Sequence, residues 1–427
     1  CEIREPKAYS IEVKDLVSGD FSGSLEVEFF SKRPLVFAYP ATSINLYGPL
    51  FSTLVHTAER TYNDLEDRKK NSATNVAESG FNLIFQENVE PFLTLINGNE
   101  PAPPHCTLTA IERDGKEQEA LLEAPTEPYG MRWIFPGAML KAEQELECAK
   151  VESSLVGVYP RLVVGNRMKD GSAYSITHSY YDCSAATDES NYWIEEQEKW
   201  HAATLMIPLY GGKDHFTRAT FYPIYSPSTF SIDVEFYDMS GTLKKTVKDA
   251  LTIQAPLKKF LQLDLSEEFS TARLIARSTT RIPARIKLGY DIGRVGGALP
   301  CNICTNLQPF IPSWDEKPFT FKWCPVLEHH EAKADVWVCN SSQHKTYTRQ
   351  AEVQLTFYRE KDSKTLQRTV SLPPHGSVRI RREEDGELQE FFGGRPGWMT
   401  ATSSNPHILT YTFIETASGN FGGDHGF

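Results

Sequence analysis

The sequence predicts an all-β protein built of tandem antiparallel β-sandwich repeats, immunoglobulin-like or jelly-roll-like, with few short helices. Three observations predict this class: period-2 alternation of polar and apolar residues, turn signals between the alternating runs, and landmarks that recur at a nearly constant spacing. The chain has 427 residues, 40% of them hydrophobic and 23% charged. That is an ordinary globular composition, with room for about three domains of ~100–200 residues.

Alternating runs rich in β-branched and aromatic residues identify the strands. They include residues 24–30, 92–96, 233–237 and 353–358. Successive side chains of a strand point to opposite faces, so this period fits strands with one buried face. Turn signals separate the runs, namely Arg113-Asp114-Gly115, Met239-Ser240-Gly241 and Pro374-His375-Gly376.

Helical patterns are scarce. We expect one helix over residues 50–62 and a linker helix over residues 188–202. In both segments the apolar residues recur too irregularly for a strong amphipathic face.

Similar segments recur along the sequence and indicate an internal repeat. Pro208 and Pro325 lie in similar strand-like segments 117 residues apart, and residues 234–237 resemble residues 355–358 at an offset of 121. A fainter copy lies upstream at residues 92–97. Several short strands per ~100-residue unit favour a sandwich over a barrel or propeller.

Composition suggests where the units meet. A polar, acidic stretch covers residues 184–202, and Asn, Pro and Ser accumulate over residues 302–318. The expected units are a strand-rich region over 1–80, which belongs to the first sandwich or stands alone, and sandwich repeats over 81–185, 203–308 and 309–427.

Charge and hydropathy limit the classes of partner that the protein is expected to bind. The 44 Lys and Arg against 56 Asp and Glu give a formal charge of -12, which disfavours binding to a polyanion, so we expect no nucleic acid partner. No apolar run is long enough for a membrane-spanning helix. We expect membrane attachment only if Cys1 is a lipidated mature N-terminus, the alternative being an arbitrary start of the numbering.

Four cysteines form a candidate zinc site. Cys301 and Cys304 have the spacing with which thiolates grip one metal ion, and Cys324 and Cys339 follow. The second pair lacks such spacing and lies on separate strand-like stretches. Disulfides and free buried thiols are the alternatives.

Two short segments carry candidate ligand-binding residues. On a helix, His56 and Arg60 would share one face and could hold a carboxylate or phosphate, although a solvated polar face is the simpler interpretation. On a strand, His178 and Asp182 share a face while Cys183 points the other way, which argues against a Cys–His nucleophile pair. Catalytic residues are not assigned.

The glycine-rich tail is the candidate assembly element. Its adjacent Asp424 and His425 could also belong to a metal site or a catalytic triad, and a flexible terminus is the default interpretation. Added to a neighbour's sheet edge, either the tail or the strand near residues 24–30 would bind through main-chain hydrogen bonds. The assembly residues proposed on this basis are Gly419, Phe421, Asp424, His425 and Phe427.

The sequence contains no G-x-S-x-G elbow, P-loop, H-E-x-x-H or EF-hand motif. We therefore expect no cofactor and a non-enzymatic extracytoplasmic protein, secreted or at the cell surface. It would act by self-assembly or protein binding, with other subunits or its own copies as partners. The alternative is a carbohydrate-binding or carbohydrate-active protein, because exposed aromatic side chains can stack on sugars.

Overall fold

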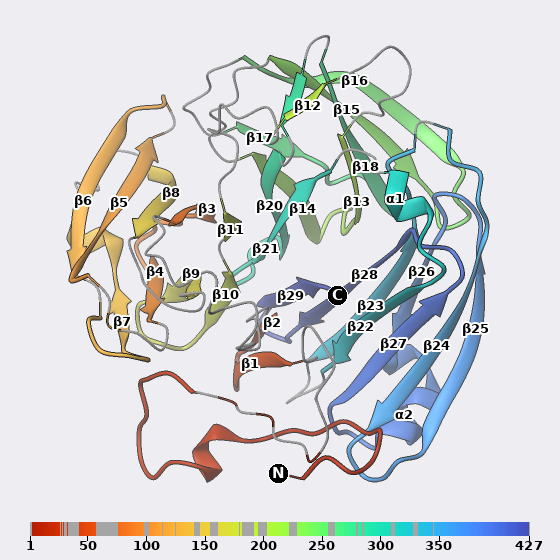
Figure 1. The fold of residues 1–427 in the computed structure, drawn as a ribbon, viewed down its shortest axis with the longest axis horizontal. Helices are drawn as coiled ribbons and strands as arrows, with labels where there is room; N and C mark the ends of the chain where they lie inside the picture. The colour runs from red at the N-terminus through yellow and green to blue at the C-terminus, as the bar shows by residue number, and fades with distance from the viewer. Residues whose placement is uncertain are drawn as a thin grey trace.

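The alternating runs form antiparallel strands in the computed structural model, which confirms the all-β class with few short helices (Figure 1). The strands of the described residues belong to three two-sheet sandwiches, one hairpin and one short separate ribbon. The structure describes residues 2–25, 27, 29, 32, 42–56, 76–97, 101, 103–112, 114–123, 125–140, 146–153, 161–178, 180–181, 192–194, 203–221, 229–254, 261–278, 281–283, 286–308, 312–327, 332–344 and 346–426.

The first sandwich pairs a four-stranded sheet with a five-stranded sheet. The four-stranded sheet has the order β10 (Tyr174–His178), β9 (Arg161–Met168), β4 (Val89–Ile96) and β7 (Met131–Ile134). The five-stranded sheet has the order β11 (Tyr180–Tyr181), β3 (Val76–Asn82), β8 (Leu146–Ser153), β5 (His105–Glu112) and β6 (Glu117–Glu123).

The second sandwich is made of two four-stranded sheets. One has the order β13 (Ala203–Pro208), β18 (Thr271–Arg277), β15 (Phe230–Tyr237) and β16 (Leu243–Ile253). The other has the order β17 (Leu261–Asp264), β14 (His215–Phe221), β20 (Ile286–Arg294) and β21 (Cys301–Leu307). A separate short ribbon pairs β12 (Tyr192–Ile194) with β19 (Arg281–Pro283).

The third sandwich repeats this plan. One sheet has the order β22 (Thr320–Val326), β27 (Gly397–Ser403), β24 (Ala351–Arg359) and β25 (Thr365–Leu372). The other has the order β26 (Ser377–Arg381), β23 (Lys333–Asn340), β28 (Ile408–Glu415) and β29 (Phe421–His425).

All three sandwiches share one topology. If β11 and β19 are left aside and the strands of each sandwich are numbered along the chain, every sandwich has the orders 1-6-3-4 and 5-2-7-8. Pro208 and Pro325 both lie in first strands, and the 234–237 and 355–358 segments both lie in third strands. The tandem repeat detected in the sequence is therefore a repeat of the fold.

Buried apolar side chains fill each sandwich between its sheets. Leu93 and Leu108 belong to the first core, Ile232 and Leu288 to the second, and Val336 to the third. The second core also includes residues of the third sandwich, namely Trp337, Tyr411, Phe413 and Phe421. The second and third sandwiches are thus joined by a continuous apolar interface.

The final strands of the three sandwiches meet near the centre of the molecule (Figure 1). Strand β21 contacts both β10 and β29. A hairpin of β1 (Ser43–Gly48) and β2 (Phe51–His56) also reaches this region, where β2 contacts β10 and β29. The centre is therefore built from chain segments that are far apart in the sequence.

Helices are few and short. The structure has α1 (Pro312–Asp315), α2 (Gly386–Phe392) and 3-10 turns at Val13–Asp15, Pro136–Ala138 and Arg382–Glu384. Among the described residues, none of these helices is long and apolar enough to cross a membrane.

The two helices expected from the sequence are corrected where the structure describes them. Residues 51–56 form strand β2, all of whose side chains are buried, and residues 192–194 form strand β12. Strand β2 is buried on both faces with Ser52 and Thr53 included, so its sequence lacks the period-2 alternation that distinguishes a strand from a helix segment. The remaining residues of both expected helices lie outside the described ranges.

Candidate metal centre

Strand β2 brings His56 to the centre of the molecule. His56 is the last residue of β2 and is 4% exposed. The strand is held in place by a hydrogen bond from the backbone N–H of Ile176 in β10 to Oγ1 of Thr53, at 3.1 Å. His56 therefore lies between the first sandwich and the end of the chain.

Strand β29 approaches β2 closely because of its glycines. A Cβ atom on Gly422 would lie 2.4 Å from the backbone oxygen of Ser52, so a larger residue does not fit without movement. Phe421 anchors the strand in the core, and its N–H donates to the Leu299 oxygen at 3.0 Å. The glycine-rich composition of the tail thus permits close strand packing.

His178 comes from a third segment. It is the last residue of β10 and is 3% exposed. Its neighbour Thr177 accepts a hydrogen bond at Oγ1 from the backbone N–H of Cys304 in β21, at 3.3 Å. The end of β10 is thereby fixed against the second sandwich.

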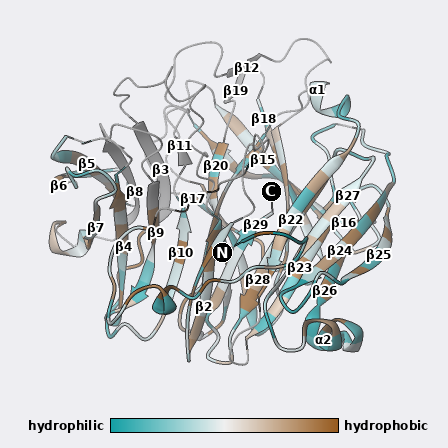
Figure 2. Cartoon of the chain, turned by 60° about the horizontal axis from the view of Figure 1, so that its bottom comes forward, coloured by the Kyte–Doolittle hydropathy of each residue, from teal (hydrophilic) through white to brown (hydrophobic). Residues whose placement is uncertain are grey.

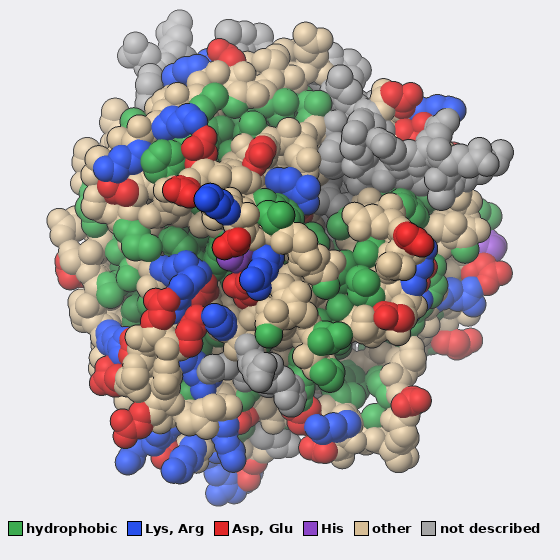
Figure 3. All heavy atoms as spheres, turned by 180° about the vertical axis from the view of Figure 1, so that it is seen from behind, with side chains coloured by type: hydrophobic (Ala, Val, Ile, Leu, Met, Phe, Trp, Pro, Cys, Tyr) green, Lys and Arg blue, Asp and Glu red, His purple; other side chains and the backbone are tan. Residues whose placement is uncertain are grey.

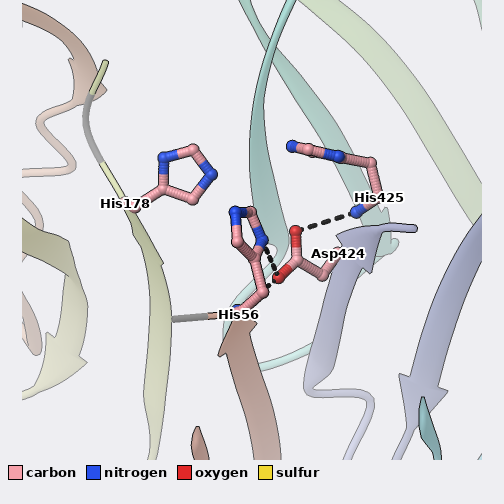
Figure 4. Close-up of side chains that lie close together, drawn as sticks. All are labelled: His56, His178, Asp424 and His425. Atoms are coloured by element: carbon pink, nitrogen blue, oxygen red, sulfur yellow. Dashed lines mark hydrogen bonds and ion pairs between the residues drawn. The ribbon is translucent and has the colours of Figure 1, made fainter. Parts of the chain in front are cut away.

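These strands assemble a histidine cluster, defined here as His56, His178, Asp424 and His425 (Figure 4). One ligand atom from each of the four residues lies within 4.8 Å of those of the other three. The ring centroids of His56 and His178 are 4.5 Å apart, and those of His56 and His425 are 5.0 Å apart. His56, His178 and Asp424 are buried, whereas His425 is partly exposed.

The Asp424 carboxylate fixes the geometry of the cluster. Its Oδ2 accepts hydrogen bonds from the backbone N–H of His56 at 2.7 Å and is 2.8 Å from the His56 Nδ1 atom. Its Oδ1 accepts the backbone N–H of His425 at 2.8 Å. Both oxygens are therefore engaged, and the contact orients the His56 ring.

Burial dominates the electrostatics of the cluster. It raises the pKa of Asp424, an effect opposed by His425, His178 and the backbone hydrogen bonds. Burial also lowers the pKa of His425 to about 4, although the Asp424 charge acts in the opposite direction. The His425 imidazole is therefore neutral near pH 7, the form in which histidine binds metals.

The structure brings together candidates that the sequence presented separately. His56 and His178 lie in one cluster with Asp424 and His425. Arg60, Asp182 and Phe427 lie outside the described residues, so their relation to the cluster is not described. The shared helical face proposed for His56 and Arg60 is corrected at His56, which lies on a strand.

The structure assigns the glycine-rich tail to its own chain. Residues Phe421–His425 pair with β28, Phe421 is fully buried, and Gly419 lies in the turn before this strand. To add to a neighbour's sheet, the strand would have to leave its own. The strand is thus paired within its own chain, and the assembly role of Gly419, Phe421, Asp424 and His425 stays a prediction.

The four candidate zinc cysteines do not form a group in the structure. All four are buried free thiols. Cys301 and Cys304 lie on β21 in the second sandwich, whereas Cys324 lies in the core of the third and Cys339 packs with Met206 and Tyr237. Burial raises the pKa of the Cys324 and Cys339 thiols to about 12, so both are protonated near neutral pH.

A second polar group, not singled out in the sequence, resembles a Ser–His–Asp relay. The His407 Nε2 atom contacts Oδ1 of Asp315 and lies 3.5 Å from Oγ of Ser342. A relay needs the acid and the nucleophile on opposite ring nitrogens. Here both contact the same nitrogen, so this arrangement does not activate Ser342.

The fold and the site together define a class: a protein of three topologically equivalent β-sandwiches whose final strands meet beside a buried histidine cluster. No family model and no curated protein sequence matches this chain. The function proposed for this protein is therefore inferred from its own residues.

Proposed function

We propose that this is a non-enzymatic structural protein that self-assembles through its N-terminal arm, defined as residues 2–25. The observation that carries the proposal is the exposure of large apolar side chains along the arm. Side chains that are more than a third exposed are Ile3, Ile11, Val13, Leu16, Phe21 and Leu25. Large apolar side chains exposed together on one segment are typical of protein interfaces.

The arm is held to the body of the molecule mainly by polar contacts. The N–H of Ala8 donates to the Arg359 oxygen in the third sandwich at 3.2 Å. The Tyr47 hydroxyl donates to the Glu12 carboxylate at 2.8 Å, and Nε1 of Trp133 donates to Oγ of Ser22 at 3.1 Å. The arm thus runs from the third sandwich past β1 to the first, and it buries Ala8 but leaves most of its large apolar side chains exposed.

The arm crosses the face that comes forward in Figure 2. Strand β1 lies beside it through the Tyr47 contact and exposes Ile44 and Leu46. Seen from behind the view of Figure 1, the surface in Figure 3 shows acidic and basic side chains interspersed with hydrophobic ones. Burial of the apolar arm against a second copy would be favourable at about 25 cal/mol per Å².

Light scattering with size-exclusion chromatography tests this proposal. The wild-type chain is expected to exceed its 48.2 kDa monomer mass as concentration rises. The double variant Ile11→Ser/Leu16→Ser should stay monomeric. Leu121→Ser is the matched control, because Leu121 is 64% exposed against 63% for Leu16 but lies on β6. Equal masses for all three chains at every concentration would refute the role of the arm.

Carbohydrate binding is the second candidate, favoured by aromatic side chains along β22 and β27. Phe321 is 53% exposed, and the rings of Trp323 and Trp398 are 5.1 Å apart. Exposed aromatic faces can stack on sugars. Binding to a glycan panel that is lost in Trp398→Ala and retained in Leu121→Ser would support this candidate over assembly.

We also propose that the protein acts outside the cytoplasm. Cys301, Cys324 and Cys339 are buried free thiols whose pKa is raised by burial, which is compatible with an oxidising compartment, since protonated thiols are poor nucleophiles. Cell fractionation tests the location, and a purely cytoplasmic distribution would contradict it.

A further inference from the structure

We propose that His56, His178 and His425 bind one divalent transition metal ion of the zinc class, with the Asp424 carboxylate holding the His56 ring in position. This site is separate from the N-terminal arm and does not depend on self-assembly. The proposal rests on the type of the donor atoms, on their proximity and on the acidic side chain among them.

The donor set is that of a transition-metal site. Three imidazoles with one carboxylate match the ligands that zinc takes in proteins, whereas calcium and magnesium prefer oxygen ligands alone. The ligand atoms lie within 4.8 Å of one another. Imidazole–metal bonds are about 2.0–2.1 Å, so small side-chain movements would bring the three rings around one ion.

The contact between Asp424 and His56 has the geometry of a metal-site support. Histidines that bind metals usually donate their other ring N–H to a carboxylate, which fixes the tautomer and the ring orientation. Here Nδ1 of His56 lies 2.8 Å from Oδ2 of Asp424. A metal ion would then be bound by the Nε2 atom of His56.

An acidic side chain lies among the three imidazoles. Asp424 is 5% exposed, and its carboxyl group contacts His56. An acidic group beside three imidazole nitrogen donors is the combination that zinc sites use.

The position of the cluster gives the metal a structural consequence. His56 belongs to the N-terminal hairpin, His178 to the first sandwich and His425 to the third. One ion would therefore join three segments that the chain connects only through long intervening sequences. We infer that metal binding stabilises the meeting point of the final strands.

The test is a titration of the full-length, chelator-treated protein with ZnCl2 by isothermal calorimetry, together with the visible spectrum after CoCl2 addition. We expect one equivalent of Zn²⁺ per chain, a cobalt spectrum typical of nitrogen ligation and a raised melting temperature. His178→Gln and His425→Gln should each weaken Zn²⁺ binding at least about 10-fold, and Asp424→Asn about 10–100-fold.

His375→Asn is the matched control, because His375 is a partly buried histidine outside the cluster. It should bind Zn²⁺ like the wild type. Circular dichroism checks that each variant is folded. If a cluster variant fails to fold, the wild-type stoichiometry and cobalt spectrum decide. Wild-type uptake below one tenth of an equivalent, or affinity unchanged by both histidine variants, would overturn the proposal.

Discussion

His178 and His425 each end the eighth strand of their sandwich, and His56 ends the strand that lies between them. Their side chains meet because the strands end at the same place. The Asp424 carboxylate accepts hydrogen bonds from the backbone N–H groups of His56 and His425 and contacts Nδ1 of the His56 ring. The chemistry of the centre is thus set by a few terminal strand positions. Other polar residues are buried for structural reasons, such as Asn340, whose amide donates to three backbone oxygens.

His375 makes stability depend on pH. It lies in a turn with a positive φ of 61°, against the Tyr237 ring of the second sandwich. Burial, with Arg273 as a further cause, lowers the pKa of His375 to about 4, while Glu235 acts in the opposite direction. The unfolded chain binds the proton near pH 6.5, so stability is lost as pH falls from about 6.5 to about 4.

The expected contribution is at most about 3 kcal/mol over this window. Urea unfolding of the wild type and His375→Asn at pH 7, 5.5 and 4.5 measures it, because Asn tolerates a positive φ and does not titrate. The variant should lose less stability than the wild type on acidification. A constant difference between the two chains at all three pH values would contradict the assignment.

At the residue scale, the sequence supplied individual candidates but not their association. His178 and the Asp424–His425 pair could be singled out from residue type alone. Their proximity depends on packing between the first and third sandwiches, which are separated in the sequence by the whole second sandwich. No local pattern encodes such a contact. The positions of the cysteines likewise depend on tertiary packing, since Cys324 and Cys339 belong to different hydrophobic clusters.

At the element scale, the contact between β2 and β29 supports the centre. Gly422 lies so close to β2 that a Cβ would be 2.4 Å from the Ser52 oxygen and 2.6 Å from the Thr53 Cα. Both are backbone atoms of a buried strand, so relief requires the strand itself to move. The packing of these two strands is therefore sensitive to a single methyl group.

Gly422→Ala is expected to destabilise the protein by about 1–3 kcal/mol through overpacking. Gly386→Ala is the matched control: a Cβ there meets nothing within 4 Å, and its effect should stay within about 1 kcal/mol. Chemical denaturation measures both. Indistinguishable unfolding midpoints would show that β29 does not pack on β2 as described.

Strands were predictable where one face is buried and the other is solvated. Strand β24 alternates in burial over its first residues and reads clearly from its sequence. Strand β2 is buried throughout although it contains Ser52, Thr53 and His56, and the sequence predicts the start of a helix there. Tertiary packing on both faces decided its structure, which local periodicity does not report.

At the scale of the whole molecule, the sequence repeat predicted the tandem sandwiches because equivalent strands keep equivalent landmarks. The arrangement of the three sandwiches around a common centre was not predictable, since it depends on which strands contact each other (Figure 1). The exposed apolar arm likewise becomes visible only once the rest of the chain has buried its own apolar residues.

We propose that copies of the chain meet at the N-terminal arm, and hydrogen–deuterium exchange of the full chain in a dilute and a concentrated sample measures this. Residues 2–25 and β1 should gain protection at high concentration, while the sandwich cores, such as β23, exchange equally in both samples. Equal exchange of the arm at both concentrations would refute its role in self-assembly.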